Sequence, residues 1–269
     1  MILKTLKEAL LNAWTMLIEF PLPFLRNDEE KLEQDKNTVI LTQILFPFVG
    51  LICALLALLL GTILGNTLHP TPASAIFAGI VTYFCVYKDS GRGLAGIMSL
   101  TSLKQKDISL EKGLFELPDS ISNMNTPIAT LTMILVILFK LFAFSVMAFY
   151  GYIYWLLAVF VLEFAIEGDL ATLPSIENGQ AMLKVEKNKQ KYIWFIAAFI
   201  VLFVLFEAPV ASLILFGVAF AMTYGIKFYC TEKINGISGK MIGLAAYIFE
   251  LFALLLGIIL LTKDQVIPS

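Results

Sequence analysis

One polar stretch, residues 88–125, holds the side chains best suited to chemistry. Those that could act on a phosphorylated substrate are Lys88, Asp89, Arg92, Asp119 and Ser120. Basic side chains and backbone N–H groups bind phosphate, and the glycines around Arg92 let a ligand approach the backbone closely. Mg²⁺ prefers one or two carboxylates together with substrate phosphate oxygens. The stretch therefore predicts a phosphate site at Lys88 and Arg92, beside a magnesium site at Asp89 and Asp119.

A purely structural role is also open for these residues, as a glycine-rich loop with an aspartate at the N-terminal cap of each following helix. A second segment, residues 235–243, has small residues at spacings that let a helix begin close to another backbone. Its candidate phosphate ligands are Ser238 and Lys240. The segment is not the phosphate loop of nucleotide hydrolases, because the glycine–lysine frame of that loop is absent and no strand precedes it.

Several charged residues lie in or beside strongly apolar runs. A carboxylate at Glu250 is costly in a membrane, which predicts that it faces the bundle interior with a partner; a structural and a catalytic role are both open. Lys140 is expected to reach one end of its helix by snorkelling. Glu163, Glu167 and Asp169 are interpreted as a solvated helix end.

The composition identifies the class of protein. The chain has 269 residues, of which 59% are hydrophobic and 15% charged, whereas a soluble domain has about 45–50% and about 25%. A bilayer accommodates this excess. The net charge of -2 gives no basic face for nucleic acid. The three cysteines have no C-x-x-C spacing, and the single histidine argues against a histidine metal site.

The apolar segments predict an all-α fold, a polytopic membrane helix bundle. Residues 1–20 are amphipathic and are expected to lie in the membrane interface. We expect a single domain over 1–269, with the interfacial helix and a cytoplasmic loop in 1–43 and the transmembrane bundle in 44–261. The seven predicted spans, at about 20 residues each for the longer ones, are 44–68, 73–87, 126–150, 152–166, 192–206, 210–226 and 241–261.

Lysine and arginine predict the orientation of these spans. Seventeen of the nineteen basic residues fall in alternate connections, and the opposite turns contain none. Basic loops stay in the cytoplasm, so the N-terminus is expected inside and the C-terminus outside. Since the outer turns are too short to bind a large ligand, a substrate site should open to the cytoplasm.

Ordered motifs along nearly the whole chain resemble the cobalamin synthase family (adenosylcobinamide-GDP ribazoletransferase). Residues 19–23 are similar to the end of its N-terminal F-L-T-R-L-P-x-P. Residues 46–51 are similar to F-P-x-V-G-x. Residues 236–243, followed by Glu250 and Leu251, resemble G-x-T-G-D-x-L-G-A and E-L. The resemblance implies a Mg²⁺-dependent membrane transferase that joins adenosylcobinamide-GDP to α-ribazole, or its 5'-phosphate, and releases GMP.

The acidic motifs of that family are incomplete here. In H-L-D-G-x-x-D-x-x-D, Asp89 matches the first aspartate, while Gly93 and Gly96 stand at the other two. In K-D-S-x-I-G, Asp119 and Ser120 match and the lysine is proline. Lys240 replaces the aspartate of T-G-D. The resemblance therefore implies Asp89 and Asp119 as remaining metal ligands, with Glu250 supporting the site, and the lost charges should weaken Mg²⁺ binding.

Two alternatives remain at this stage. One is a catalytically inactive relative that acts as a membrane binding or scaffold protein. The other is a small transporter subunit, suggested by the charged residues in the spans. The expected partners are membrane lipids, the corrinoid nucleotide and α-ribazole, with a homo-oligomer left open and nucleic acid excluded. The expected location is the inner membrane of a prokaryote.

Overall fold

The computed structural model describes residues 2–17, 36–88, 91–105, 126–176, 179, 181, 183, 190–205 and 208–266. These residues are almost entirely helical, and the predicted all-α class is confirmed. The helices are α1 (Ile2–Leu17), α2 (Lys36–Thr67), α3 (Pro70–Tyr87), α4 (Arg92–Gln105), α6 (Pro127–Phe149), α7 (Trp155–Leu170), α8 (Lys191–Val204), α9 (Pro209–Tyr229), the π-helical turn η2 (Cys230–Ile234) and α10 (Gly239–Val266).

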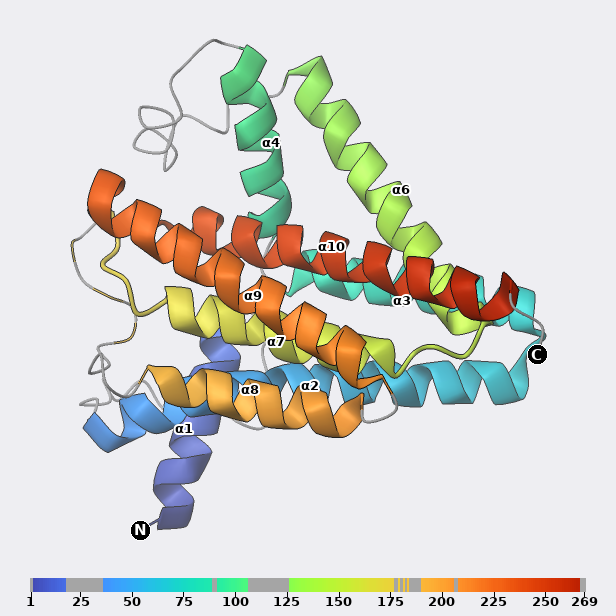
Figure 1. Ribbon diagram of the computed structural model, residues 1–269, viewed down its shortest axis with the longest axis horizontal. Helices are drawn as coiled ribbons and strands as arrows, with labels where there is room; N and C mark the ends of the chain where they lie inside the picture. The colour runs from blue at the N-terminus through green and yellow to red at the C-terminus, as the bar shows by residue number, and fades with distance from the viewer. Residues whose placement is uncertain are drawn as a thin grey trace.

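Seven of these helices coincide with the seven predicted spans. Five are long and apolar enough to cross a membrane, namely α2, α3, α6, α9 with η2, and α10. α7 has 16 residues and α8 has 14, so these two are shorter than a typical span of about 20. In Figure 1 the turns from α2 to α3 and from α6 to α7 lie at one end of the bundle, opposite the ends of α3, α7 and α9. The chain is an integral membrane protein.

α7 is the central helix of the bundle. All sixteen of its residues are buried, because α2, α8, α9 and α10 all pack against it. Its apolar residues lie on all sides of the helix, as expected of a helix in a core. Gly50 of α2 permits the closest approach, since a Cβ there would lie 2.5 Å from the backbone oxygen of Phe160. α7 is therefore an interior helix of the bundle.

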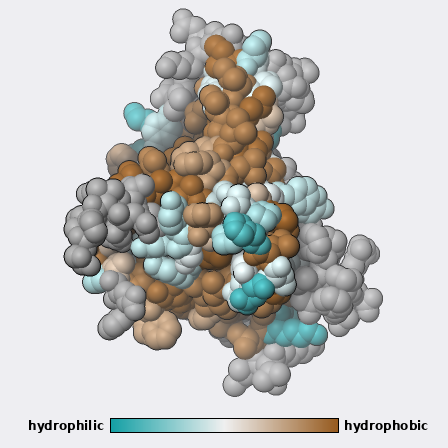
Figure 2. Space-filling view, turned by 90° about the vertical axis from the view of Figure 1, so that its right-hand side faces the viewer, coloured by the Kyte–Doolittle hydropathy of each residue, from teal (hydrophilic) through white to brown (hydrophobic). Residues whose placement is uncertain are grey.

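The outer helices expose apolar side chains, as lipid-facing helices do. Exposed fractions reach 77% at Phe203 of α8 and 63% at Phe228 of α9. Figure 2 views the end that carries the short turns, where hydrophilic residues gather, while the flanks are mainly hydrophobic. Contact of this apolar surface with water would be unfavourable, whereas contact with the hydrocarbon core of a bilayer is favourable.

Two helices cross the long direction of the bundle (Figure 1). α1 packs on α2 and buries Ala9 and Ala13 there, so a helix is present where the amphipathic one was predicted. The bounds of α4 were not predicted, although a helix that follows Asp89 was one of the alternatives for residues 88–125. Its signal was the helical spacing of Leu94 and Ile97, which pack with Tyr247 of α10.

Candidate functional site

Lys88 lies at the end of α3 and points into the bundle. Its Nζ is 2.5 Å from Oε1 of Glu163 on α7, and both side chains are 1% exposed. Burial opposes the charge, but the acidic groups around Lys88, of which Glu163 has the largest effect, together outweigh burial and hold its pKa well above the usual range. The Lys88 ammonium is therefore paired with Glu163 inside the bundle. Nothing in this geometry supports its predicted role in phosphate binding.

The start of α4 packs against the start of α10 through glycine. A Cβ on Gly93 would lie 2.6 Å from the ring of Tyr247, and one on Gly96 would lie 2.7 Å from Cβ of Leu244 and 3.0 Å from the backbone oxygen of Lys240. From the other side, a Cβ on Gly243 would lie 2.9 Å from the backbone nitrogen of Gly93. We call this contact the α4–α10 seam. Small residues at 93, 96 and 243 are required for it, so an aspartate side chain at 93 or 96 does not fit this arrangement.

The segment that leads into α10 is fixed by backbone hydrogen bonds. The N–H of Ile237 donates to the oxygen of Pro174, and the N–H of Ile176 donates to the oxygen of Ile237. Ser238 is buried, and its hydroxyl accepts a hydrogen bond from the N–H of Met241 in the first turn of α10. Ser238 therefore acts as a helix cap here, and the predicted close approach of this segment to another backbone is confirmed.

A second buried ion pair joins α6 to α10. Lys140 Nζ lies 2.6 Å from Oε2 of Glu250, and both side chains are 0% exposed. The same ammonium lies 3.5 Å from the ring centre of Tyr247, a cation–π contact. The expected interior partner of Glu250 is confirmed. The expectation that Lys140 snorkels to a helix end is wrong, because the carboxylate and the aromatic ring satisfy its charge within the bundle.

Several polar atoms around these pairs have no hydrogen-bond partner among the described residues. They are Thr82 Oγ1, Lys88 Nζ, Glu163 Oε2, Tyr247 Oη and Glu250 Oε1, although Lys88 Nζ still forms the ion pair with Glu163. Cys85 lies on α3 between Thr82 and Lys88 and is fully buried. Four helices thus contribute to one buried polar cluster inside the apolar bundle.

The acidic end of α7 is buried, so its interpretation as a solvated helix end is wrong. Glu163, Glu167 and Asp169 are 1%, 6% and 5% exposed. Asp169 accepts a hydrogen bond from the Lys227 ammonium at 2.6 Å and one from the Trp194 indole N–H at 2.9 Å. Its charge is neutralised inside the bundle, because α8 and α9 cover the end of α7.

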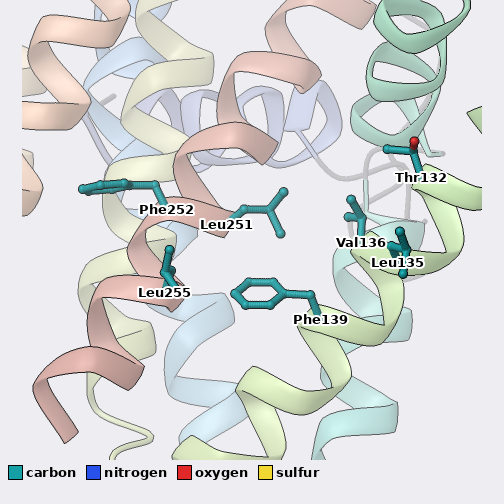
Figure 3. A pocket seen from close by; sticks show the side chains of 7 residues that line it. All are labelled: Thr132, Leu135, Val136, Phe139, Leu251, Phe252 and Leu255. Carbon is teal, nitrogen blue, oxygen red and sulfur yellow. The ribbon is translucent and has the colours of Figure 1, made fainter. Parts of the chain in front are cut away.

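An apolar groove of about 330 Å³ opens between α6 and α10. In Figure 3, Phe139 of α6 and Leu251 of α10 point toward one another across it. The other lining residues are Thr132, Leu135, Val136, Phe252 and Leu255. The lining carries no charge, so the groove suits hydrocarbon and cannot hold a phosphate.

The structure brings together only part of the predicted site. Arg92 and Lys240 lie at the α4–α10 seam and are partly exposed, with Ser238 just before α10. Glu250 lies ten residues past Lys240, about 15 Å along the helix, and faces the buried cluster. Asp89, Asp119 and Ser120 lie outside the described residues.

The donors needed for Mg²⁺ are not assembled in the described part of the chain. No group of three or more histidine, cysteine, aspartate or glutamate side chains there could hold a metal ion. Glu163 and Glu250 are committed to lysines, and Asp169 to Lys227 and Trp194. The described residues therefore do not fit a magnesium site.

These features define a class: an integral membrane helix bundle with buried ion pairs and a polar end where α3, α4, α7 and α10 meet. A comparison with protein families matches residues 127–259 to the family described as cobalamin-5-phosphate synthase. This segment, which runs from α6 through most of α10, is similar to the cobalamin synthase family, and the resemblance found in the sequence is confirmed. No significant match to a curated protein or to a solved structure was found.

The matched segment contains residues 236–243, Lys140 and Glu250, but it begins after the other motifs. It does not include Asp89, Gly93, Gly96 or Asp119. The family match supports a membrane transferase of cobalamin biosynthesis in general terms. The roles of individual residues stay predictions.

Proposed function

We propose that the protein is a membrane transferase that joins adenosylcobinamide-GDP to α-ribazole, or to its 5'-phosphate, with release of GMP. The observation that supports this most is the family match over residues 127–259, which includes the start of α10. The reacting phosphates would lie at the polar end of the α4–α10 seam, where Arg92 and Lys240 provide positive charge. The two substrates and membrane lipids are the partners in this proposal, with a homo-oligomer left open.

Mg²⁺ belongs to the proposal and would depend on Asp89 and Asp119. In a phosphoryl-type transfer the metal neutralises charge on the diphosphate and on the leaving group. Ser120 is assigned to the same site, and Glu250 stabilises α10 from within the bundle. We place the site on the cytoplasmic side of a prokaryotic inner membrane, since seventeen of nineteen basic residues fall in the connections on that side.

Release of GMP tests this function directly. Purified protein in detergent is incubated with adenosylcobinamide-GDP, α-ribazole and Mg²⁺, and GMP is measured by chromatography. We expect Asp89→Ala and Asp119→Ala each to lower the rate at least about a hundredfold, as loss of a major electrostatic contact does. Lys233→Ala, an exposed substitution in η2, is the control and should keep the wild-type rate. Unchanged activity in both aspartate variants would reject the site assignment.

A second candidate function is favoured by one observation, the α4–α10 seam. Gly93 and Gly96 take two positions where the family resemblance implies aspartate, and packed helix fills the space of those side chains. This supports a catalytically inactive relative that binds a nucleotide-linked ligand or a protein partner in the membrane. Absence of GMP release, together with absence of Mg²⁺ binding in calorimetry, would favour this candidate over the first. Movement of a solute into proteoliposomes would instead support the transporter alternative.

A further inference from the structure

A polar pocket of about 220 Å³ lies between α7, α8 and α9, away from the α4–α10 seam. Its lining residues are Asp169, Gln190, Lys191, Trp194, Phe220, Tyr224 and Lys227. Figure 1 shows that the end of α7 and the start of α8 lie toward the same end of the bundle, opposite the short turns. Pockets that enclose a whole small molecule measure about 300–1,000 Å³. This one therefore suits a head group whose remainder lies outside the protein.

The pocket is built around a fixed ammonium group. Lys227 donates hydrogen bonds to Asp169 at 2.6 Å and to Gln190 at 3.2 Å. Among the described residues these are its two acceptors, so the third N–H of the ammonium is available to a ligand. The second oxygen of Asp169 accepts from Trp194, which is 7% exposed. Both oxygens of the Asp169 carboxylate therefore accept hydrogen bonds, one from Lys227 and one from Trp194. The carboxylate orients Lys227 and presents no unpaired negative charge to a ligand.

The surrounding charge favours an anion. Lys191 is exposed at the start of α8 and forms no ion pair with a described residue. With Lys227 and Asp169, it gives the pocket a net positive charge. In the sequence, the segment just before α8 contains lysines at 184, 187 and 189 and one glutamate. Basic clusters of this size next to a membrane helix attract anionic lipids.

The aromatic side of the pocket indicates its depth in the membrane. Trp194 contacts the rings of Phe216 and Phe220 at 5.8 and 5.4 Å between centroids. Tyr224 is 66% exposed and lies one turn before Lys227 on the same face of α9. Tryptophan and tyrosine gather at the head-group level of bilayers. The pocket therefore runs from lysines at the water side to aromatic rings at the hydrocarbon side.

From this gradient we propose that the pocket binds the phosphate head group of an anionic phospholipid, with its acyl chains against the exposed apolar faces of α8 and α9. Lys227 and Lys191 contact the phosphate, and Trp194 and Tyr224 pack against the glycerol region. The site does not depend on the transferase reaction, because none of its residues belongs to the α4–α10 seam. It would anchor the end of α7 in the membrane interface.

Lipid binding is measured on the purified full-length protein by native mass spectrometry, with phosphatidylglycerol and phosphatidylcholine of matched chains. We expect one phosphatidylglycerol to bind at least about tenfold more tightly than phosphatidylcholine, since each lysine near an anionic surface contributes about fivefold. Lys191→Gln should lower this preference about fivefold, and the triple variant Asp169→Asn/Lys191→Gln/Lys227→Gln should abolish it. Lys233→Gln removes an equal charge outside the pocket and is the matched control.

The outcomes separate this proposal from its competitors. Equal loss in Lys233→Gln and Lys191→Gln would mean general charge attraction and would overturn the pocket. Displacement of phosphatidylglycerol by glycerol 3-phosphate at equal concentration would identify a site for soluble phosphates and would overturn the lipid assignment. Because Lys191 is exposed, its substitution leaves the fold intact, so the single variant decides the matter even if the triple variant does not fold.

Discussion

Lys140→Met is expected to lower the free energy of unfolding by about 3–5 kcal/mol, the usual effect of removing one member of a buried ion pair. The Glu250 carboxylate would be left in the bundle without a counter-charge, since Lys140 Nζ is its ion-pair partner at 2.6 Å and both side chains are fully buried. The ring of Tyr247 would also lose its cation–π contact with the ammonium.

Equilibrium unfolding in mixed micelles measures this effect. In the double variant Lys140→Met/Glu250→Leu both charges are replaced by apolar groups of similar size, which is often neutral or stabilising for a buried pair. We therefore expect the double variant to recover most of the lost stability. Lys233→Met, exposed in η2, is the control and should stay within about 0.5 kcal/mol of wild type. A single variant as stable as wild type would mean that Glu250 is neutral or has another partner.

Gly96→Asp is the second change with a large expected effect, because it places a family-type carboxylate in the α4–α10 seam. The new Cβ would meet Cβ of Leu244 at 2.7 Å and the oxygen of Lys240 at 3.0 Å. Overpacking of this kind costs about 1–3 kcal/mol, and an unpaired carboxylate in the contact adds to it. We expect the variant to be at least about 3 kcal/mol less stable and to gain no Mg²⁺ binding.

Two glycine controls separate the contributions. Gly96→Ala keeps the steric conflict without the charge and should lose about 1–3 kcal/mol. Gly79→Ala in α3 meets nothing within 4 Å and should be neutral or more stable by up to about 1 kcal/mol. Unfolding is followed in micelles and Mg²⁺ binding by calorimetry. A stable Gly96→Asp protein that binds Mg²⁺ would show that the seam opens to admit an acidic site.

The helices of the bundle were largely predictable from the sequence. Each of the seven apolar segments forms a helix, because the hydropathy that predicts a span depends only on the residues of that segment. The bounds of α4 were not predicted, since its apolar residues lie in a polar stretch with several glycines. The full burial of α7 was missed too, because its acidic residues suggested contact with water and only α8 and α9 around it reveal otherwise.

The candidate site was predictable in its residue types and much less in its contacts. The prediction that small residues at 236–243 let a helix begin close to another backbone is confirmed, because glycine permits such a close approach. Lys88 was assigned to phosphate, whereas the fold turns it toward Glu163, 75 positions later in the chain. A lysine beside a glycine-rich stretch has the same local sequence whether it binds phosphate or forms a buried ion pair. The predicted metal ligands Asp89 and Asp119 stay untested predictions.

The sequence by itself determined that this chain lies in a membrane, where its seven apolar helices run and which family it resembles, since these depend on local hydropathy and on ordered motifs. The tertiary structure decided which charges meet. Lys140 and Glu250 are 110 positions apart, and Gly96 meets α10 only because two helices cross. Pairing depends on distances between segments remote in the chain, and no pattern within one segment contains those distances.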